Sequence, residues 1–300
     1  MIHVVGNAAI DTIFRVDRFP LPGETIVAGA LAEDLGGKGA NQAVIIARAG
    51  LPVRLVAAVG DDQPGAVIRS SLAAEGVGVD GLRTVGGATD RSSIYVDAMG
   101  ENTIVSAIAC AAAFDPAATS GLAGIGAGDT VLCQGNLGAA ALRGVLAAAR
   151  TAGATTVLNP SPTTGFSGFD WRLADLVVVN RVEATELAGC DRVDAAVDGL
   201  HKAGAGSVVA TLGGDGALMA GAVQLAVPAV TVEAVDTTGA GDVFCGMLTA
   251  MRASGRPWRT SLTIAAEAAA LKVTRRGVLA AFPSAAEIAG IVARHEGAEA

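Results

Sequence analysis

The dominant feature of the sequence is the alternation of short apolar runs with stretches rich in alanine and leucine. The apolar runs lie at residues 53–59, 131–133, 155–158, 176–179 and 207–212. Because polar residues do not alternate with apolar ones in them, they are typical of strands buried on both faces of a parallel sheet. Helical spacing marks residues 138–152 and 193–203. The alternation of strand and helix predicts an α/β fold with right-handed crossovers.

Two segments, at about residues 12–35 and 90–110, break this rhythm. In both, apolar residues alternate with polar ones, as in SIYVD at 93–97. This pattern indicates a sheet with one face exposed to solvent. Such strands would form a small second sheet over the carboxyl ends of the main strands, where open α/β folds bind ligands. We expect one domain over residues 1–300, with these two segments inserted in it as a lid.

Charge and hydropathy argue against two classes of partner. The chain has 21 basic and 29 acidic residues and a formal net charge of −8, so no basic surface is available for a nucleic-acid backbone. Although 51% of the residues are hydrophobic, no apolar run approaches the roughly 18 residues of a spanning helix. The first residues also lack the pattern of a secretory signal. We expect a cytoplasmic protein that binds neither nucleic acid nor membranes.

Two nucleotide-binding motifs can be dismissed. Gly76, Gly78 and Gly81 form a literal G-x-G-x-x-G, but a helical stretch precedes them, so Gly76 is expected to end that helix in a left-handed conformation. Lys38 is followed by Gly39 where a Walker A loop needs Ser or Thr.

The segment DTTGAGD at residues 236–242 directly precedes an apolar helical stretch. Its small residues allow a tight turn that leaves N–H groups unpaired at a helix N-terminus, which favours an anion. Asp242 falls in the first turn of the same helix, where a carboxylate would accept a hydroxyl proton while the N–H groups stabilise a transferred phosphoryl group. The alternative is that Asp236 and Asp242 have no catalytic role and only cap the helix or balance the partial positive charge at its N-terminus.

A second cluster, GGKGANQA at residues 36–43, combines permissive backbone with an ammonium and an amide. Backbone N–H groups, Lys38 and Asn41 would together hold several hydroxyls of a polyol. The alternative is an ordinary solvated loop.

These two segments resemble, in the expected order, the two signatures of the ribokinase-like (PfkB) carbohydrate kinases. NRVE at 180–183 and TLGGDG at 211–216 resemble further elements of that family, and the similarity extends from Gly6 and Asp11 to VTRRG at 273–277. The resemblance implies an α/β/α three-layer sandwich with a mostly parallel central sheet and a small β lid.

The resemblance also implies site residues for an ATP- and Mg²⁺-dependent kinase of a small sugar. Asp242 would be the base that deprotonates the primary hydroxyl, and the anion hole would consist of Gly239, Ala240 and Gly241. The sugar hydroxyls would be held by Asp11, Gly37, Lys38, Asn41, Asn136 and Asp242. The nucleotide would be held by Asn180, Thr211, Gly213, Gly216, Ala240 and Gly241, with Glu183 acting on magnesium through water.

A monovalent cation such as K⁺ often activates members of the family. By position its site would include Asp236, Thr238, Lys272, Arg275 and Gly277, but Ala281 stands where a serine is common. The resemblance also implies a homodimer that associates through the lid.

Two departures from the family pattern concern the substrate. Ala9 replaces an asparagine, and Asn136 follows the strand where an acidic residue is usual. Without that amide and that carboxylate, some hydroxyls of ribose would be left without a partner, and each one that is buried would cost about 1–3 kcal/mol of binding free energy. Another pentose, a hexose, a nucleoside or a substituted sugar would therefore suit the pocket better. A nucleoside kinase and a catalytically silent sugar or nucleotide sensor remain alternatives.

Overall fold

The computed structural model describes residues 1–296, and within them nine strands form one large sheet. In spatial order they are β13 (Leu225–Val227), β12 (Ala217–Ala220), β11 (Ser207–Thr211), β10 (Leu176–Asn180), β9 (Thr155–Asn159), β8 (Thr130–Gln134), β1 (Ile2–Val5), β4 (Val53–Gly60) and β5 (Leu82–Val85). All strands from β11 to β5 pair in parallel. The last two strands, β12 and β13, add an antiparallel edge that the sequence patterns did not predict.

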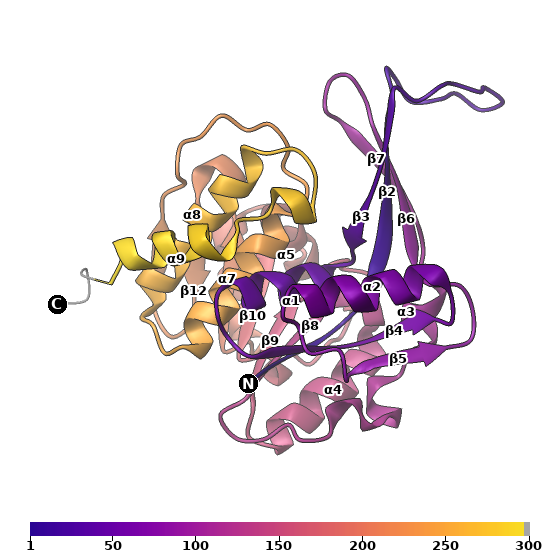
Figure 1. Cartoon of the computed structure of the whole chain (residues 1–300). Coiled ribbons are helices and arrows are strands. Elements are labelled where there is room, and N and C mark those ends of the chain that lie inside the picture. The colour runs from indigo at the N-terminus through magenta and orange to yellow at the C-terminus, as the bar shows by residue number, and fades with distance from the viewer. Residues whose placement is uncertain (297–300) are drawn as a thin grey trace.

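Helices cover both faces of this sheet (Figure 1). On one face pack α1 (Lys38–Arg48), α2 (Gln63–Ala74), α7 (Ala240–Ala253), α8 (Trp258–Val273) and α9 (Ala285–Arg294). On the other pack α3 (Ala109–Ala113), α4 (Ala139–Thr151), α5 (Arg181–Ala188) and α6 (Val193–Lys202). Successive side chains of a strand point to opposite faces: Val4 belongs to the first core and Val5 to the second. The three-layer sandwich predicted from the sequence is confirmed.

A separate four-stranded sheet forms the lid and projects from the main body beside α1 and α2 (Figure 1). Its order is β3 (Ala30–Gly36), β2 (Ala9–Arg15), β6 (Arg91–Val96) and β7 (Asn102–Ala107). The central pair β2–β6 is parallel, whereas both outer pairs are antiparallel. Ile13 and Ile94 are buried, but every residue of β7 is exposed. The alternating pattern thus located the lid, although β2 begins at Ala9, before the predicted start.

Glycines end or begin several helices as the sequence indicated. Gly76 has φ +78° and follows Glu75, the C-cap residue of α2, which confirms that its G-x-G-x-x-G terminates a helix. At the other motif, Gly37 has φ +90° and α1 begins at Lys38. None of the helices in residues 1–296 is long and apolar enough to cross a membrane.

Candidate active site

Four neighbouring parallel strands end in a polar residue. These residues are Gln134 of β8, Asn159 of β9, Asn180 of β10 and Thr211 of β11. In the sheet register Gln134 pairs with Asn159, and Asn180 pairs with Thr211. Because parallel strands present their carboxyl ends at one edge, these side chains form a polar row where α/β sheets bind ligands.

Helices α1 and α7 pack closely beside this edge. A Cβ atom added to Gly246 of α7 would lie 2.9 Å from Ile45 Cγ2 and 3.0 Å from the carbonyl oxygen of Gln42. Glycine therefore allows the two backbones to approach, which brings the first turn of α1 against the first turn of α7.

Two amides from α1 hold the carboxylate of Asp242. Asn41 Nδ2 donates to Asp242 Oδ2 at 3.0 Å, and Gln42 Nε2 donates to Asp242 Oδ1 at 2.9 Å. All three side chains are buried. The structure thus brings together Asn41 and Asp242, which the sequence assigned to the site from positions about 200 residues apart.

The amide network continues to the strand ends. Gln42 Nε2 also donates to Asn159 Oδ1 at 3.1 Å, and Gln42 Oε1 accepts from Gln134 Nε2 at 2.8 Å. Asn159 Nδ2 donates in turn to the carbonyl oxygen of Val178 at 2.9 Å. Sequence reasoning missed Gln42, Asn159 and Gln134 as a network that orients Asp242. The available signal was a polar residue at the end of each apolar run.

The turn before α7 leaves backbone donors available. Gly239, the residue before the helix, has φ +77°. The Ala240 N–H donates to the carbonyl oxygen of Thr237 at 3.2 Å, whereas within the described chain no backbone carbonyl accepts from the N–H groups of Gly239, Gly241 and Asp242. A Cβ atom on Gly241 would meet no atom within 4 Å. Unpaired donors and open space at a helix N-terminus suit an anion.

Asp11 lies in β2 of the lid and is 8% exposed. Gly36, the last residue of β3, packs directly against the Asp11 carboxylate: a Cβ atom added to Gly36 would lie 2.2 Å from Asp11 Cγ. Burial raises the pKa of Asp11 to about 6; a hydrogen bond with Ser92 opposes the shift, and the negative charges of Asp34 and Asp242 add to it. The lid therefore brings Asp11 within electrostatic reach of Asp242.

Three further residues that the sequence assigned to the sugar lie in three different environments: Gly37, Lys38 and Asn136. Gly37 is pressed against the backbone of Ala8, whose Cα would lie 2.9 Å from an added Cβ. Within the described residues the side-chain ammonium of Lys38 has no hydrogen-bond or ion-pair partner. Asn136 Oδ1 is buried without a partner, as is Asn41 Oδ1. Such buried acceptors are costly unless a ligand satisfies them.

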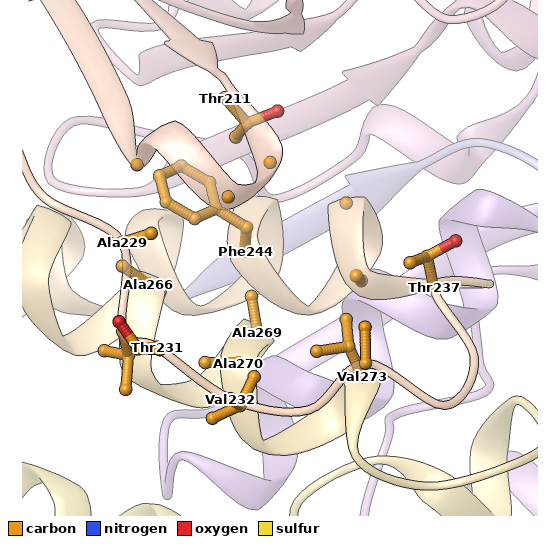
Figure 2. A pocket seen from close by; sticks show the side chains of 17 residues that line it. Thr211, Ala229, Thr231, Val232, Thr237, Phe244, Ala266, Ala269, Ala270 and Val273 are labelled. Carbon is orange, nitrogen blue, oxygen red and sulfur yellow. The ribbon is translucent and has the colours of Figure 1, made fainter.

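A cavity of about 340 Å³ lies on the other side of the anion-binding turn. It is lined by five of the six residues assigned to the nucleotide: Thr211, Gly213, Gly216, Ala240 and Gly241. Figure 2 shows Phe244 of α7 and Ala266 and Ala269 of α8 as part of its apolar wall. The sequence did not single out this wall, although an alanine-rich face of α8 was visible. An apolar cleft beside unpaired N–H groups can hold a flat ring and its phosphates.

Asn180 is the sixth residue assigned to the nucleotide, and it forms a capping box with Glu183. Asn180 Oδ1 accepts from the Glu183 N–H at 2.9 Å, and Glu183 Oε2 accepts from the Asn180 N–H at 2.8 Å. Residues 1–296 contain no cluster of three His, Cys, Asp or Glu side chains placed to bind a metal. Mg²⁺ bound with substrate phosphates needs only one or two protein carboxylates, and one oxygen of Glu183 fits that requirement.

The residues assigned to a monovalent cation also lie together. The carboxylate of Asp236 accepts from the N–H groups of Thr238 at 2.9 Å and Gly277 at 3.0 Å. Burial opposes its ionisation, but these hydrogen bonds and the charge of Lys272 outweigh burial and lower the pKa of Asp236. Lys272 Nζ itself donates to the carbonyl oxygen of Asp236 at 2.8 Å.

Comparisons with known proteins identify the family and agree with the fold. The model of the pfkB family carbohydrate kinases matches residues 1–285. A ribokinase from Schizosaccharomyces pombe is 32% identical, over 96% of both chains. The crystal structure of a ribokinase from Thermotoga maritima superposes with a TM-score of 0.89 at 28% identity, over 97% of this chain and 99% of that one. The Arabidopsis thaliana ribokinase complexed with ribose and ATP gives a TM-score of 0.85 at 27% identity, over 97% and 98%. The chain therefore belongs to the pfkB family of carbohydrate kinases, enzymes that transfer a phosphoryl group to a sugar hydroxyl.

Proposed function

We propose that this kinase transfers the γ-phosphoryl group of ATP to the primary hydroxyl of a ribose-like pentose or a related carbohydrate, with Asp242 as the base. The observation that carries the proposal is the position of Asp242: its carboxylate is fixed by Asn41 and Gln42, in the same helical turn as the unpaired N–H groups. On one side of that turn lies the apolar cavity, and on the other lies the lid with Asp11.

In the proposed reaction Asp242 accepts the proton of the primary hydroxyl. The hydroxyl oxygen then bonds to the γ-phosphorus while the bond from that phosphorus to the bridging oxygen of ADP breaks, and ADP leaves with the electron pair. In the segment Gly239, Ala240 and Gly241, the unpaired N–H groups of Gly239 and Gly241 donate to the transferred group, whose charge is stabilised best by fixed donors. Bound Mg²⁺ would neutralise phosphate charge next to Glu183 and Asn180.

The sugar would lie between the lid and the first turn of α1. Asp11 would accept from its hydroxyls, Lys38 and the N–H of Gly37 would donate, and the unpartnered oxygens of Asn41 and Asn136 would accept. This arrangement gives a substrate a reason to bind here, because its hydroxyls satisfy acceptors that are otherwise buried and unpaired. The ribose and ATP complex of the Arabidopsis relative supports a pentose as substrate.

A nucleoside kinase is the second candidate, and one observation favours it. A cavity of about 420 Å³ lies between the outer part of the lid, including Val16 and Val96, and the loop that contains Asp236 and Thr238. That space would accept a base or another substituent on the sugar. A catalytically silent sensor would bind the same ligands without turnover.

The decisive measurement is ADP release from ATP and Mg²⁺ across a panel of free pentoses, hexoses and nucleosides. We expect turnover with a free pentose and little with nucleosides, and the reverse order would favour the second candidate. The Asp242→Asn variant should lose about 100- to 10,000-fold in kcat and keep its affinity for ATP. Asp191→Asn, a change at an exposed aspartate, is the matched control. Near-normal turnover by Asp242→Asn would contradict the mechanism, and no ADP release with any alcohol would indicate a sensor.

We also propose that the kinase works in the cytoplasm, where ATP is supplied.

We propose, in addition, that the kinase is a homodimer joined through the lid. The lid carries an exposed edge strand, β7, in which Ile104 and Val105 are half or more exposed. An unpaired, apolar edge of this kind is a surface that natural proteins normally cover.

A further inference from the structure

Lys272, in the last turn of α8, has its ammonium group buried under the loop that leads to the anion-binding turn. Its side chain is fully buried. Nζ donates to the carbonyl oxygens of Asp236 at 2.8 Å and Arg275 at 3.4 Å, and lies 3.7 Å from Asp236 Oδ1. The charge is therefore surrounded by oxygen atoms from two loops, the one that precedes α7 and the one that follows α8.

A buried ammonium is stable only when such oxygens compensate its lost hydration. Burial lowers the pKa of Lys272, and the neighbouring carboxylate of Asp236 opposes that shift. The same carboxylate accepts from Thr238 and Gly277. Ammonium and carboxylate thus join the loop that precedes Gly239 to the loop that follows α8.

The oxygen atoms around Lys272 cannot also serve as ligands of an additional monovalent cation. A K⁺ ion would need the carbonyl oxygens of Asp236 and Arg275, and both already accept from Lys272. Ala281, at the position where the family pattern has a hydroxyl, has no side-chain oxygen to offer. A second positive charge next to the ammonium would also be repelled.

We infer that the ammonium of Lys272 is a built-in replacement for a monovalent cation, so that the kinase needs no K⁺. Lys272 is a positioning residue: it holds Asp236, Asp236 holds the N–H of Thr238, and Thr238 is followed directly by Gly239. The inference rests on the proposed role of residues Gly239, Ala240 and Gly241 as the anion hole.

The first test uses the unmodified protein. Initial rates of ADP formation should be equal in KCl, NaCl and tetramethylammonium chloride at one ionic strength, and so should the thermal unfolding midpoints. Activation by KCl, or a higher midpoint in KCl alone, would overturn the inference. The unfolding midpoints need no turnover, so they still decide the question if the proposed reaction itself fails.

The second test removes the ammonium. In tetramethylammonium chloride, Lys272→Ala should lose about 10- to 100-fold in kcat, the scale of a misplaced catalytic group, with a smaller change in KM for ATP. KCl or ammonium chloride should restore much of the rate and raise the unfolding midpoint, because the truncated side chain leaves space among the carbonyl oxygens. Lys202→Ala, at an exposed lysine of α6, is the control.

A Lys272→Ala variant as active as the unmodified protein in tetramethylammonium chloride would overturn the inference, because the ammonium would then be dispensable. A reduced rate of Lys272→Ala that was the same in KCl as in tetramethylammonium chloride would overturn it too, because a small cation should replace the ammonium between the loops and a bulky one should not. If the variant folds in neither salt, the cation comparison on the unmodified protein decides.

Discussion

At the scale of single residues, the chemistry depends on how neutral amides hold one carboxylate. Gln42 contacts Asp242, Asn159 and Gln134 at once. We expect Gln42→Leu to lower kcat about 10- to 100-fold, because Asp242 loses one of its two orienting donors. KM for ATP should change little, since Gln42 does not line the apolar cavity. Steady-state kinetics with varied ATP and varied sugar separate the two effects.

The same substitution should also cost stability. Asn159 Oδ1 and Gln134 Nε2 would each lose a buried partner, at about 1–3 kcal/mol per unsatisfied group. Gln224→Leu is a matched control, because Gln224 also donates to an aspartate, Asp198, but at the exposed surface. Equal losses of kcat in the two variants would mean that the amide network does not orient Asp242.

Asp11 gives a prediction about pH. Its pKa is raised from the ordinary 3.8 to about 6, so between these values the folded chain holds a proton that the unfolded chain has released. That contribution to stability is complete below about pH 4 and is lost as the pH rises through 6. At pH 8, Asp11→Asn should therefore be more stable than the unmodified protein by at most about 3 kcal/mol, from about 1.4 kcal/mol per pKa unit.

Urea unfolding of both proteins at pH 8 and pH 5 tests the direction of this stability difference. The stability advantage of Asp11→Asn should narrow at the lower pH, while its KM for the sugar should exceed that of the unmodified protein at pH 8 and approach it at pH 5. In the unmodified protein, KM for the sugar should fall as the pH rises through 6 and Asp11 becomes an anionic acceptor. An Asp11→Asn variant that is destabilised equally at both pH values would refute the buried-charge account.

At the scale of elements, the site depends on the packing of α1 against α7. Gly246 has no room for a side chain against Ile45 and the Gln42 carbonyl. Gly246→Val should separate the helices, cost about 1–3 kcal/mol of unfolding free energy, and lower kcat because Asn41 and Gln42 move away from Asp242. Thermal unfolding and kinetics on the same preparation measure both losses.

Gly290→Ala provides the opposite control. Gly290 is an exposed residue within α9, and an added Cβ meets nothing within 4 Å. Removing a glycine from a helix interior should stabilise the protein by about 0.5–1 kcal/mol without affecting kcat. If Gly246→Val were equally harmless, close packing of α1 and α7 would not be needed.

Element types were predictable where one physical cause dominates. Burial on both faces made the strands from β8 to β11 apolar, and glycine at positive φ marked the end of α2 and the start of α1. The antiparallel strands β12 and β13 were missed because they are short and their pattern is weak. The network around Gln42 was missed for another reason: its partners are 92 to 200 residues away. The sheet register brings Gln134 and Asn159 together, and the packing of α1 against α7 adds Asp242. Lys272 was placed at the cation site by position, but that its ammonium takes up the carbonyl oxygens was visible only in three dimensions.

At the scale of the whole molecule, the two faces of the lid have different neighbours. Side chains of a strand alternate between faces, and the register places Thr12, Phe14, Glu33, Leu31, Tyr95 and Val105 on the face opposite Asp11. On that opposite face Phe14 stacks on Tyr95 with ring centroids 5.3 Å apart, and Leu31 and Val105 are more than 60% exposed. In the proposed homodimer a second lid would cover this apolar patch.

A charge placed in this patch should therefore dissociate the proposed dimer. We expect Val105→Asp to halve the mass measured by light scattering, because the introduced carboxylate would be buried in the proposed interface without a cation. Val223→Asp, at an exposed valine in the turn between β12 and β13, should leave the mass unchanged. If the lid also needs its partner to close over the sugar, the monomeric variant should show a raised KM for the sugar with an unchanged KM for ATP, since the apolar cavity lies in the main body. An unmodified protein with the mass of a single chain would remove the dimer and, with it, any role of a partner in closing the lid.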